Sequence, residues 1–240
     1  MCGRFTLHTE KEALAERFEL ELAQLAALAP HYNIAPTQDV LAIRADRRSP
    51  RRVAALVRWG LVPSWSKAIG AQALMINARV ESLAEKPAFA RSLESQRCLI
   101  PADGFYEWQA AGSRARTKQP HLVARADGEP FAMAGLFARW HPPGTQGGEA
   151  LVSCAIVTTA AVGELRALHD RMPVILPREA EARWLDPALD GDTSALLALL
   201  QPVPAEELYT QPVSRRVNDV ANDDVELLKR DESEPSLGLF

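Results

Sequence analysis

The sequence predicts an α+β fold, a single domain with a mostly antiparallel, barrel-like sheet and helices at its periphery. Three observations support this prediction. Short β-prone runs recur along most of the chain, helical stretches are inserted between them, and no internal repeat or Gly/Ser-rich linker divides the 240 residues. Many strands in succession with a few inserted helices are typical of α+β proteins, and this length is enough to bury a substantial core.

In the amino-terminal part we expect one helix and a β-hairpin. Thr9 and Glu12 form a capping-box pattern ahead of apolar residues at helical spacing. The stretch 31–38, HYNIAPTQ, is predicted to be a loop. Residues 39–44 and 53–58 are predicted strands. The turn between them is expected to be a solvated hairpin tip, and its basic residues are Arg47, Arg48, Arg51 and Arg52.

Strands predominate further along the chain, and helices gather towards the carboxyl end. The breaker-rich stretches 59–65 and 141–149 are predicted loops. Helices are expected at residues 84–93, 161–168, 178–185 and 193–200. Strands are expected at residues 97–108, 120–125, 131–138, 151–158 and 207–213.

The net charge is −4, and the acidic excess lies at the carboxyl end. Residues 218–240 carry seven acidic side chains against two basic ones, which leaves 25 basic and 24 acidic residues in the rest of the chain. We therefore predict a domain over residues 1–224 and an acidic tail over residues 225–240. Because the body is nearly neutral, any phosphate-binding site on it must be a local basic patch.

The composition and the beginning of the chain favour a cytoplasmic protein. No apolar stretch approaches the ~18 residues of a membrane span, and the start, MCGRFTLHTEKE, lacks the apolar core of a signal peptide. Three cysteines, Cys2, Cys98 and Cys154, are too few for a disulfide framework and are typical of a reducing compartment. No heptad pattern argues for an oligomer, so we expect a monomer.

Cys2 is the most unusual candidate for chemistry. Aminopeptidases remove Met1 when the second residue is small, and this would leave Cys2 with a free α-amine beside its thiol. The ordinary pKa values of these groups, about 8 and about 8.5, make both partly available at neutral pH. A 1,2-aminothiol reacts characteristically with an aldehyde: the amine forms a Schiff base, and the thiol closes on it to give a thiazolidine, favoured by proximity. A cysteine that merely occupies position 2 is the alternative.

Three further residues are candidates to support such chemistry, each with a structural alternative. Glu107 lies between Tyr106 and Trp108 in a hydrophobic run, where burial would raise its pKa into a range useful for acid–base catalysis. Alternation along the strand would instead point it to solvent. Asn77 suits the orientation of a nucleophile, or it caps a turn. His169 suits proton donation or oxyanion stabilisation, or it is structural.

Basic and aromatic residues near these positions are candidates for a nucleic-acid interface. Arg4, Arg79 and Arg171 each stand within a few residues of one candidate, and guanidiniums bind phosphates well. Aromatic rings stack on single-stranded bases for roughly 1–3 kcal/mol each, whereas core packing is the alternative. The aromatic candidates are Trp59, Trp65, Tyr106 and Trp108.

Nothing in the sequence predicts a cofactor. The phosphate-binding patterns GxxxxGK[ST] and GxGxxG are absent, as are CxxC and HExxH, and the five histidines are scattered. We therefore expect neither a metal nor a nucleotide cofactor.

Taken together, these segments resemble the SRAP (SOS response-associated peptidase) family. They follow the family's order from residue 1 to about residue 224, and they read MCGRF, YNIAPT, WGLVPSW, NARVE, CLIPADGFYEW, HDRMPVIL and PVSRRVN. One departure is Ser66, where a family member carries a second tryptophan, so that base stacking is expected to be weaker there.

The resemblance implies a protein of the SOS response to DNA damage that acts on abasic sites in single-stranded DNA at replication forks. It implies that Cys2, once Met1 is removed, forms a covalent thiazolidine crosslink that protects the site. Asn77 would hold Cys2 and the opened sugar, Glu107 would shuttle protons, and His169 would support the sugar oxygen. The resemblance also implies peptidase activity towards Met1 and lyase-like Schiff-base chemistry. Implied contacts to DNA are Arg4, Asn33, Trp65, Arg79, Trp108 and Arg171.

Two other functions stay open at this stage. Cys2 would equally serve a thiol or amino-terminal-nucleophile peptidase acting on other proteins, with Glu107 or His169 as the base. A non-catalytic module would instead bind single strands without using Cys2.

Overall fold

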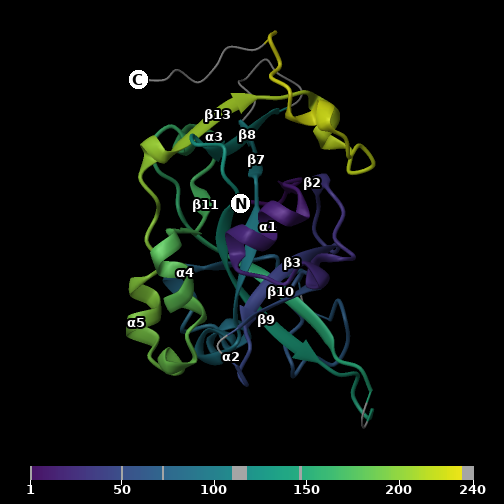
Figure 1. The fold of residues 1–240 in the computed structure, drawn as a ribbon, viewed down its shortest axis with the longest axis vertical. Coiled ribbons are helices and arrows are strands. Elements are labelled where there is room, and N and C mark those ends of the chain that lie inside the picture. The colour runs from purple at the N-terminus through teal and green to yellow at the C-terminus, as the bar shows by residue number, and fades with distance from the viewer. Residues whose placement is uncertain (1, 50, 72, 110–117, 146–147, 234–240) are drawn as a thin grey trace.

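The structure is a computed structural model that describes residues 2–49, 51–71, 73–109, 118–145 and 148–233. Its strands form one sheet of five strands and one of eight. The five-stranded sheet lies towards the top of Figure 1 and the eight-stranded sheet below it, with short helices on the outside. The α+β fold with a mostly antiparallel, barrel-like sheet is therefore confirmed.

The eight-stranded sheet contains a closed barrel of five strands. Its pairing order is β10, β4, β3, β6 and β9, and β9 pairs with β10 to complete the ring. All of these pairings are antiparallel except β10 with β4. The bounds are β3 Asp39–Ala45, β4 Arg52–Trp59, β6 Arg97–Ala102, β9 Phe131–Trp140 and β10 Leu151–Ala160.

Apolar residues are buried on both faces of the barrel strands. Ile43, Leu99, Ala134 and Ile156, from four different barrel strands, are fully buried. Gly135 on β9 allows a close approach, because a Cβ built there would lie 2.8 Å from Cys98 Sγ.

Three short strands extend the barrel sheet, and the other sheet is antiparallel throughout. The extensions are β5 Asn77–Arg79 and β11 Arg171–Pro173 on β10, and β12 Ile175–Leu176 on β9. The five-stranded sheet runs β13 Leu208–Pro212, β8 Gln119–Arg125, β7 Gly104–Gln109, β1 Phe5–Leu7 and β2 His31–Ile34.

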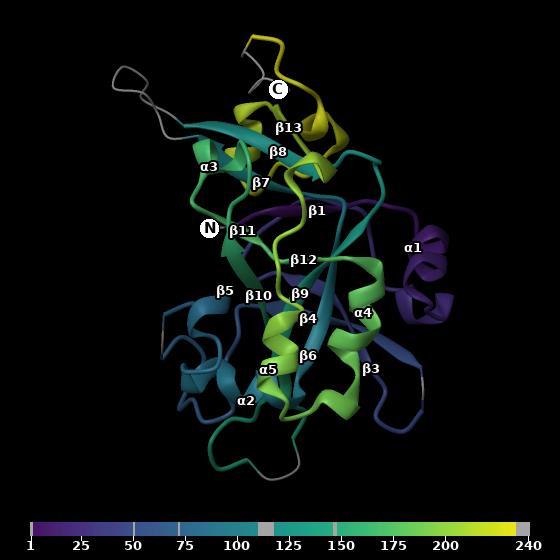
Figure 2. The same ribbon diagram turned by 90° about the vertical axis from the view of Figure 1, so that its left-hand side faces the viewer.

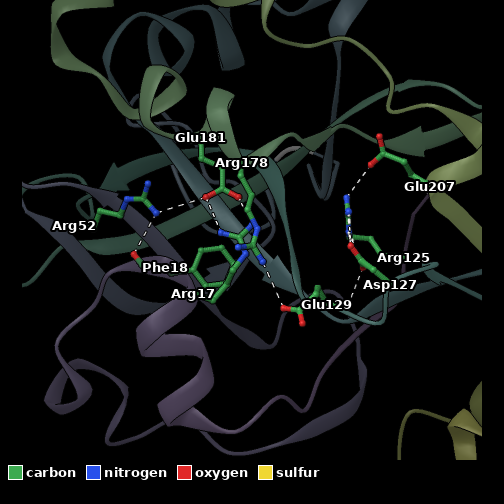
Figure 3. Close-up of polar contacts among 9 residues, drawn as sticks. All are labelled: Arg17, Phe18, Arg52, Arg125, Asp127, Glu129, Arg178, Glu181 and Glu207. Carbon is green, nitrogen blue, oxygen red and sulfur yellow. Dashed lines mark hydrogen bonds and ion pairs between the residues drawn. The ribbon is translucent and has the colours of Figure 1, made fainter.

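The helices lie at the periphery of the sheets (Figure 2). Their bounds are α1 Lys11–Phe18, α2 Pro87–Ser95, α3 Leu165–Leu168, α4 Arg178–Leu185 and α5 Thr193–Ala198. An ion pair fastens α1 to α4: Arg17 Nη2 lies 2.5 Å from Glu181 Oε1, and Arg52 reaches the other carboxylate oxygen at 3.6 Å (Figure 3). The Glu181 side chain is only 1% exposed, so this carboxylate depends on its two arginines.

The structure corrects two local predictions at the amino-terminal end. The capping box is wrong: α1 has no side-chain cap, because the Thr9 hydroxyl and N–H donate to Asp103 instead. The loop predicted for residues 31–38 is wrong over its first half, which forms β2 and pairs with β1. The strand run predicted for residues 97–108 is interrupted at Asp103, which separates β6 from β7.

The carboxyl segment packs on the five-stranded sheet. A 3₁₀ helix, Val225–Leu228, places Leu227 in a fully buried cluster with Tyr106 and Val213, and Val213 bridges to Arg230. The first residues beyond 224 thus contact the domain, whereas residues 234–240 of the predicted acidic tail lie outside the described residues. In the part of the chain that the structure describes, no helix is long and apolar enough to cross a membrane.

Candidate active site

The beginning of the chain is fixed in the middle of the five-stranded sheet. β1 lies between β7 and β2, with Phe5 opposite Phe105, and Phe5 packs edge-on against Trp59 with ring centroids 5.2 Å apart. Asp103 accepts backbone N–H groups from the two residues that follow β1. Cys2, just before β1, is therefore held by a strand anchored on both sides.

Cys2 is fully buried and held through its backbone. Its thiol donates to the Arg4 carbonyl at 3.8 Å, and its own carbonyl accepts a hydrogen bond of 2.8 Å from Asn77 Nδ2. Burial raises the pKa of the Cys2 thiol, and the negative charge of Glu107 raises it further. The thiol is therefore protonated at neutral pH, and it lies within electrostatic reach of the Glu107 carboxyl.

Asn77 has one amide atom in use and one without a partner. The residue begins β5, which pairs in parallel with β10 opposite Ile156. Among the described residues, the buried Oδ1 of Asn77 has no hydrogen-bond donor. A buried acceptor without a donor costs free energy, so this oxygen suits a donor on a bound molecule. Thr158 Oγ1, on the adjacent strand β10, is also buried without a hydrogen-bond partner among the described residues.

Glu107 is buried on β7, and the alternative that places it in solvent is wrong, because its exposed fraction is 4%. Burial is the main cause that raises the pKa of Glu107 to about 7; the charge of Asp170 raises it further, while that of Lys118 lowers it. A carboxyl with this pKa is present in both protonation states near neutrality, as a group that both gives and takes protons must be.

His169 directly follows α3, and the charges of Asp170 and Lys118, which act on Glu107, also act on His169. Its Nδ1 accepts the backbone N–H of Arg171 at 3.0 Å, and Asp170 Oδ1 lies 2.7 Å from it. Burial lowers the pKa of His169, and this outweighs the opposite effect of Asp170. The lowered pKa keeps the ring neutral near pH 7. The bond from Arg171 fits the tautomer with its proton on Nε2, and the Asp170 carboxylate fits the tautomer with its proton on Nδ1.

Two of the predicted DNA contacts are well exposed. Arg79 is exposed at the end of β5, two residues from Asn77, and the Trp65 side chain is 56% exposed. Arg4 lies under the ring of Trp108, with its Cζ 5.7 Å from the ring centroid, and its Nη1 donates to Asn33 Oδ1 and to the Val217 carbonyl, each at 2.7 Å. Trp108 Nε1 in turn donates to Asn218 at 2.7 Å, so its ring is only partly free.

The other predicted contacts are tied into the protein. Asn33 is 2% exposed, and its Nδ2 donates to three backbone carbonyls of residues 217–222. Arg171 donates to both oxygens of Glu81 and to the Thr158 carbonyl. A phosphate would have to displace these partners. Trp59 and Tyr106 are fully buried core residues, so stacking on bases is wrong for both.

Sequence reasoning missed His121 and Lys118. His121 is 1% exposed and lies directly opposite Glu107 on β8, and side chains of directly opposed residues share one face of a sheet. Lys118 is exposed, and its charge acts on both Glu107 and His169. Only the β7–β8 register reveals His121 as the neighbour of Glu107. Among the residues whose placement is described, no His, Cys, Asp or Glu cluster could hold a metal ion.

The fold and the site together define an α+β barrel domain with a buried cysteine, a buried carboxyl whose pKa is about 7 and a neutral imidazole. The chain belongs to the SOS response associated peptidase (SRAP) family, whose model matches residues 1–220.

The family assignment agrees with similar proteins from bacteria and vertebrates. The chain is 40% identical over 230 residues to the abasic site processing protein YoqW of Bacillus subtilis, covering 95% of this chain and 99% of YoqW. It is 34% identical over 233 residues to the abasic site processing protein YedK of Escherichia coli, with the same coverage. The abasic site processing protein HMCES of Xenopus tropicalis is 34% identical over 83% of this chain and 65% of HMCES.

Solved structures share the fold. A protein from Bacteroides thetaiotaomicron superposes with a TM-score of 0.83 at 24% identity, over 96% of this chain and 100% of that one. A protein from Bordetella bronchiseptica superposes with a TM-score of 0.73 at 28% identity, over 89% of this chain and 100% of that one.

Proposed function

We propose that this protein processes abasic sites in single-stranded DNA by forming a covalent thiazolidine crosslink through Cys2 after removal of Met1. The observation that carries the proposal is the position of Cys2, held by Asn77 and within reach of Glu107, whose pKa is about 7. Its relatives YoqW, YedK and HMCES are named abasic site processing proteins. Met1 itself lies outside the described residues.

The chemistry starts at the amine, because burial keeps the thiol protonated. The α-amine of Cys2 adds to the aldehyde carbon of the opened sugar, and the resulting carbinolamine loses water when protonated Glu107 gives a proton to the leaving hydroxyl. The iminium charge that forms next to the thiol lowers the thiol's pKa. Glu107, now a carboxylate, takes the thiol proton as sulfur bonds to the imine carbon and nitrogen recovers its lone pair.

The remaining site residues orient and stabilise the sugar. The free Oδ1 of Asn77 accepts from a sugar hydroxyl or from the amine, while its Nδ2 keeps Cys2 in place. In the tautomer with its proton on Nε2, neutral His169 donates to the ring oxygen as the sugar opens. Arg4 and Arg79 contact flanking phosphates, and Trp65 and Trp108 contact neighbouring bases. Asn33 and Arg171 contribute to DNA binding by fixing neighbouring segments: Asn33 holds residues 217–222, and Arg171 holds Glu81.

A denaturing gel with an abasic single-stranded oligonucleotide tests the proposal. Intact mass spectrometry first establishes that the sample lacks Met1. We expect a heat-stable shifted band with the abasic strand and none with a tetrahydrofuran analogue, which has no aldehyde. Cys98→Ala, a change at another buried free cysteine, should leave the band unchanged, whereas Cys2→Ala should abolish it. Absence of the band from Met1-free protein, with turnover of peptides instead, would overturn the proposal in favour of a peptidase.

A further inference from the structure

A cavity lies away from the candidate active site, at the opposite end of the barrel strands. Its volume is about 610 Å³, within the range of small-ligand pockets. It is lined by the end of β3 and the following turn, the junction of α2 with β6, the end of β9, and residues 185–190. In Figure 2 these elements lie in the lower part of the molecule, below the chain start. None of its lining residues belongs to the candidate active site.

Arginines dominate the cavity wall. Five of them, Arg44, Arg47, Arg48, Arg97 and Arg139, face only two aspartates, Asp46 and Asp190. Such a local positive excess is notable in a chain whose net charge is −4. Arg47 and Arg48 of the hairpin turn, which the sequence predicts to be a solvated tip, therefore line a concave surface.

Two of these arginines build the cavity and are fully engaged. Arg97 is buried, and its guanidinium donates to four backbone carbonyls and to Asp190 at 2.9 Å. Arg47 pairs with the other oxygen of Asp190 at 2.8 Å and donates to the Ser95 carbonyl. Asp190 is therefore already neutralised by these two partners, and its charge does not compensate the others.

Arg44 and Arg139 have no acid bonded to them, although the charge of Asp46 acts on Arg44 from a distance. Neither guanidinium forms a hydrogen bond or an ion pair with any of the described residues. Arg44 Cζ lies over the ring of Phe137, 5.8 Å from its centroid. Burial lowers the pKa of Arg44, and the like charge of Arg139 lowers it further. Two neighbouring guanidiniums at a partly desolvated wall, neither of them paired with an acid among the described residues, are matched to an anion from outside.

We propose that this cavity binds a phosphate group, held by the paired guanidiniums of Arg44 and Arg139 with Arg48 at the rim. Guanidinium forks match the geometry of phosphate oxygens, and several arginines suit a group with more than one negative charge. The apolar wall formed by Val53, Phe137 and Leu185 leaves room for an uncharged part of the ligand, as in a nucleotide. The phosphate source is either a small phosphorylated molecule or the backbone of bound DNA.

Isothermal titration calorimetry on the whole protein, with pyrophosphate, with dAMP and with an undamaged oligonucleotide, tests this site. We expect the wild type to bind pyrophosphate and Arg44→Gln/Arg139→Gln to bind it at least about tenfold more weakly. Arg139→Gln alone, at an exposed residue, should weaken binding without disturbing the fold. The matched control Arg51→Gln/Arg178→Gln removes two exposed, acid-paired arginines and should bind as the wild type does.

The outcomes separate the two sources and the two proposals. Tighter binding of dAMP than of pyrophosphate, with oligonucleotide affinity unchanged in the double variant, assigns a small phosphorylated ligand. Weaker oligonucleotide binding by the double variant assigns the DNA backbone. No heat with any of the three phosphates, or equal affinities of wild type and double variant, overturns the site. Crosslinking to abasic DNA through Cys2 is measured separately, so failure of either proposal leaves the other intact.

Discussion

Asn77 holds Cys2 by a single hydrogen bond of 2.8 Å, from its side-chain amide to the Cys2 carbonyl, and its other amide atom is buried without a donor among the described residues. The bond joins the two sheets, because Asn77 begins β5 of the barrel sheet and Cys2 precedes β1 of the other. The amide thus positions the nucleophile and presents an acceptor to whatever binds beside it.

Asn77→Asp should slow crosslinking by about 100-fold, because a carboxylate oxygen facing the Cys2 carbonyl repels it and displaces the nucleophile. The measurement is the initial rate of band formation with an abasic strand. Gln24→Ala, which also removes an amide bonded to backbone, serves as the control and should react at the wild-type rate. An Asn77→Asp protein that reacts normally would remove Asn77 from the site.

Glu107→Gln should remove an inflection near pH 7 from the crosslinking rate, because the pKa of Glu107 is about 7. Glutamine neither gives nor takes the proton, so the rate should be low at every pH. Glu21→Gln, at an exposed carboxylate, is the control and should keep the inflection. Persistence of the inflection in Glu107→Gln would assign it to another group.

The same pKa makes the stability of the protein depend on pH. Unfolded Glu107 releases its proton near its ordinary value of 4.5, whereas the folded protein keeps it up to about pH 7. Between these values the folded state holds the extra proton, so the free energy of unfolding decreases as the pH rises, by about 3 kcal/mol in total. Urea titrations of wild type and Glu107→Gln at pH 4.5 and pH 7.5 should show this difference; a pH-independent gap would contradict the raised pKa.

Cys2→Ser should form the Schiff base but not the stable ring, because a hydroxyl is a far weaker nucleophile than a thiol towards the imine carbon. We expect its adduct on a denaturing gel only after borohydride reduction, while the wild-type adduct survives without it. Mass spectrometry must confirm that both samples begin at residue 2. An equally stable untrapped adduct from the serine variant would contradict the role of sulfur.

Arg79→Gln should weaken single-strand binding uniformly across sequences and reduce the slope of log affinity against log salt by about 1, since one phosphate contact is lost. Fluorescence anisotropy at several salt concentrations measures the slope. Arg178→Gln, on α4 beside Glu129, is the control and should leave it unchanged. Arg171→Gln distinguishes a phosphate contact from a structural pairing, because loss of a phosphate contact lowers the slope, whereas loss of the pairing with Glu81 leaves the slope unchanged.

Glu181→Gln should destabilise the protein by about 3–5 kcal/mol, because it leaves Arg17 charged in a buried position without its partner. Chemical denaturation measures the loss, and crosslinking per folded molecule should stay normal. Glu21→Gln breaks the exposed pair with Arg51 and should cost no more than about 1 kcal/mol. Similar decreases in the free energy of unfolding for Glu181→Gln and Glu21→Gln would show that burial of the ion pair does not determine how much its loss destabilises the protein.

The strand pattern and the burial of Glu107 were predictable from the sequence, because both depend on local residues. The runs at 39–44 and 53–58 became the hairpin β3–β4, and Glu107 proved buried as its apolar neighbours suggested. β2 was missed because His31–Ile34 is polar and precedes a proline; it is a strand only through its pairing with β1. The capping box failed because a distant residue, Asp103, binds Thr9.

The features that could not be predicted from the sequence depend on contacts between distant segments. His121 joins Glu107 only through the register of β7 with β8. Asn33, expected at DNA, is enclosed because the segment 217–222 folds back over it. The arginine cavity brings together residues 44–48, 97 and 139, which meet only when β3, β6 and β9 become neighbours.

Closure of the barrel has a consequence for how the chain is made. β10 supplies the last wall of the ring, and it runs parallel to β4, from which it is separated by a long stretch of sequence. During synthesis, β3, β4, β6 and β9 therefore leave the ribosome before the strand that covers their open edges. Pairings between such distant segments form slowly. Until β10 pairs, the edges of β4 and β9 stay exposed, and the nascent chain is most prone to aggregation and most dependent on chaperones.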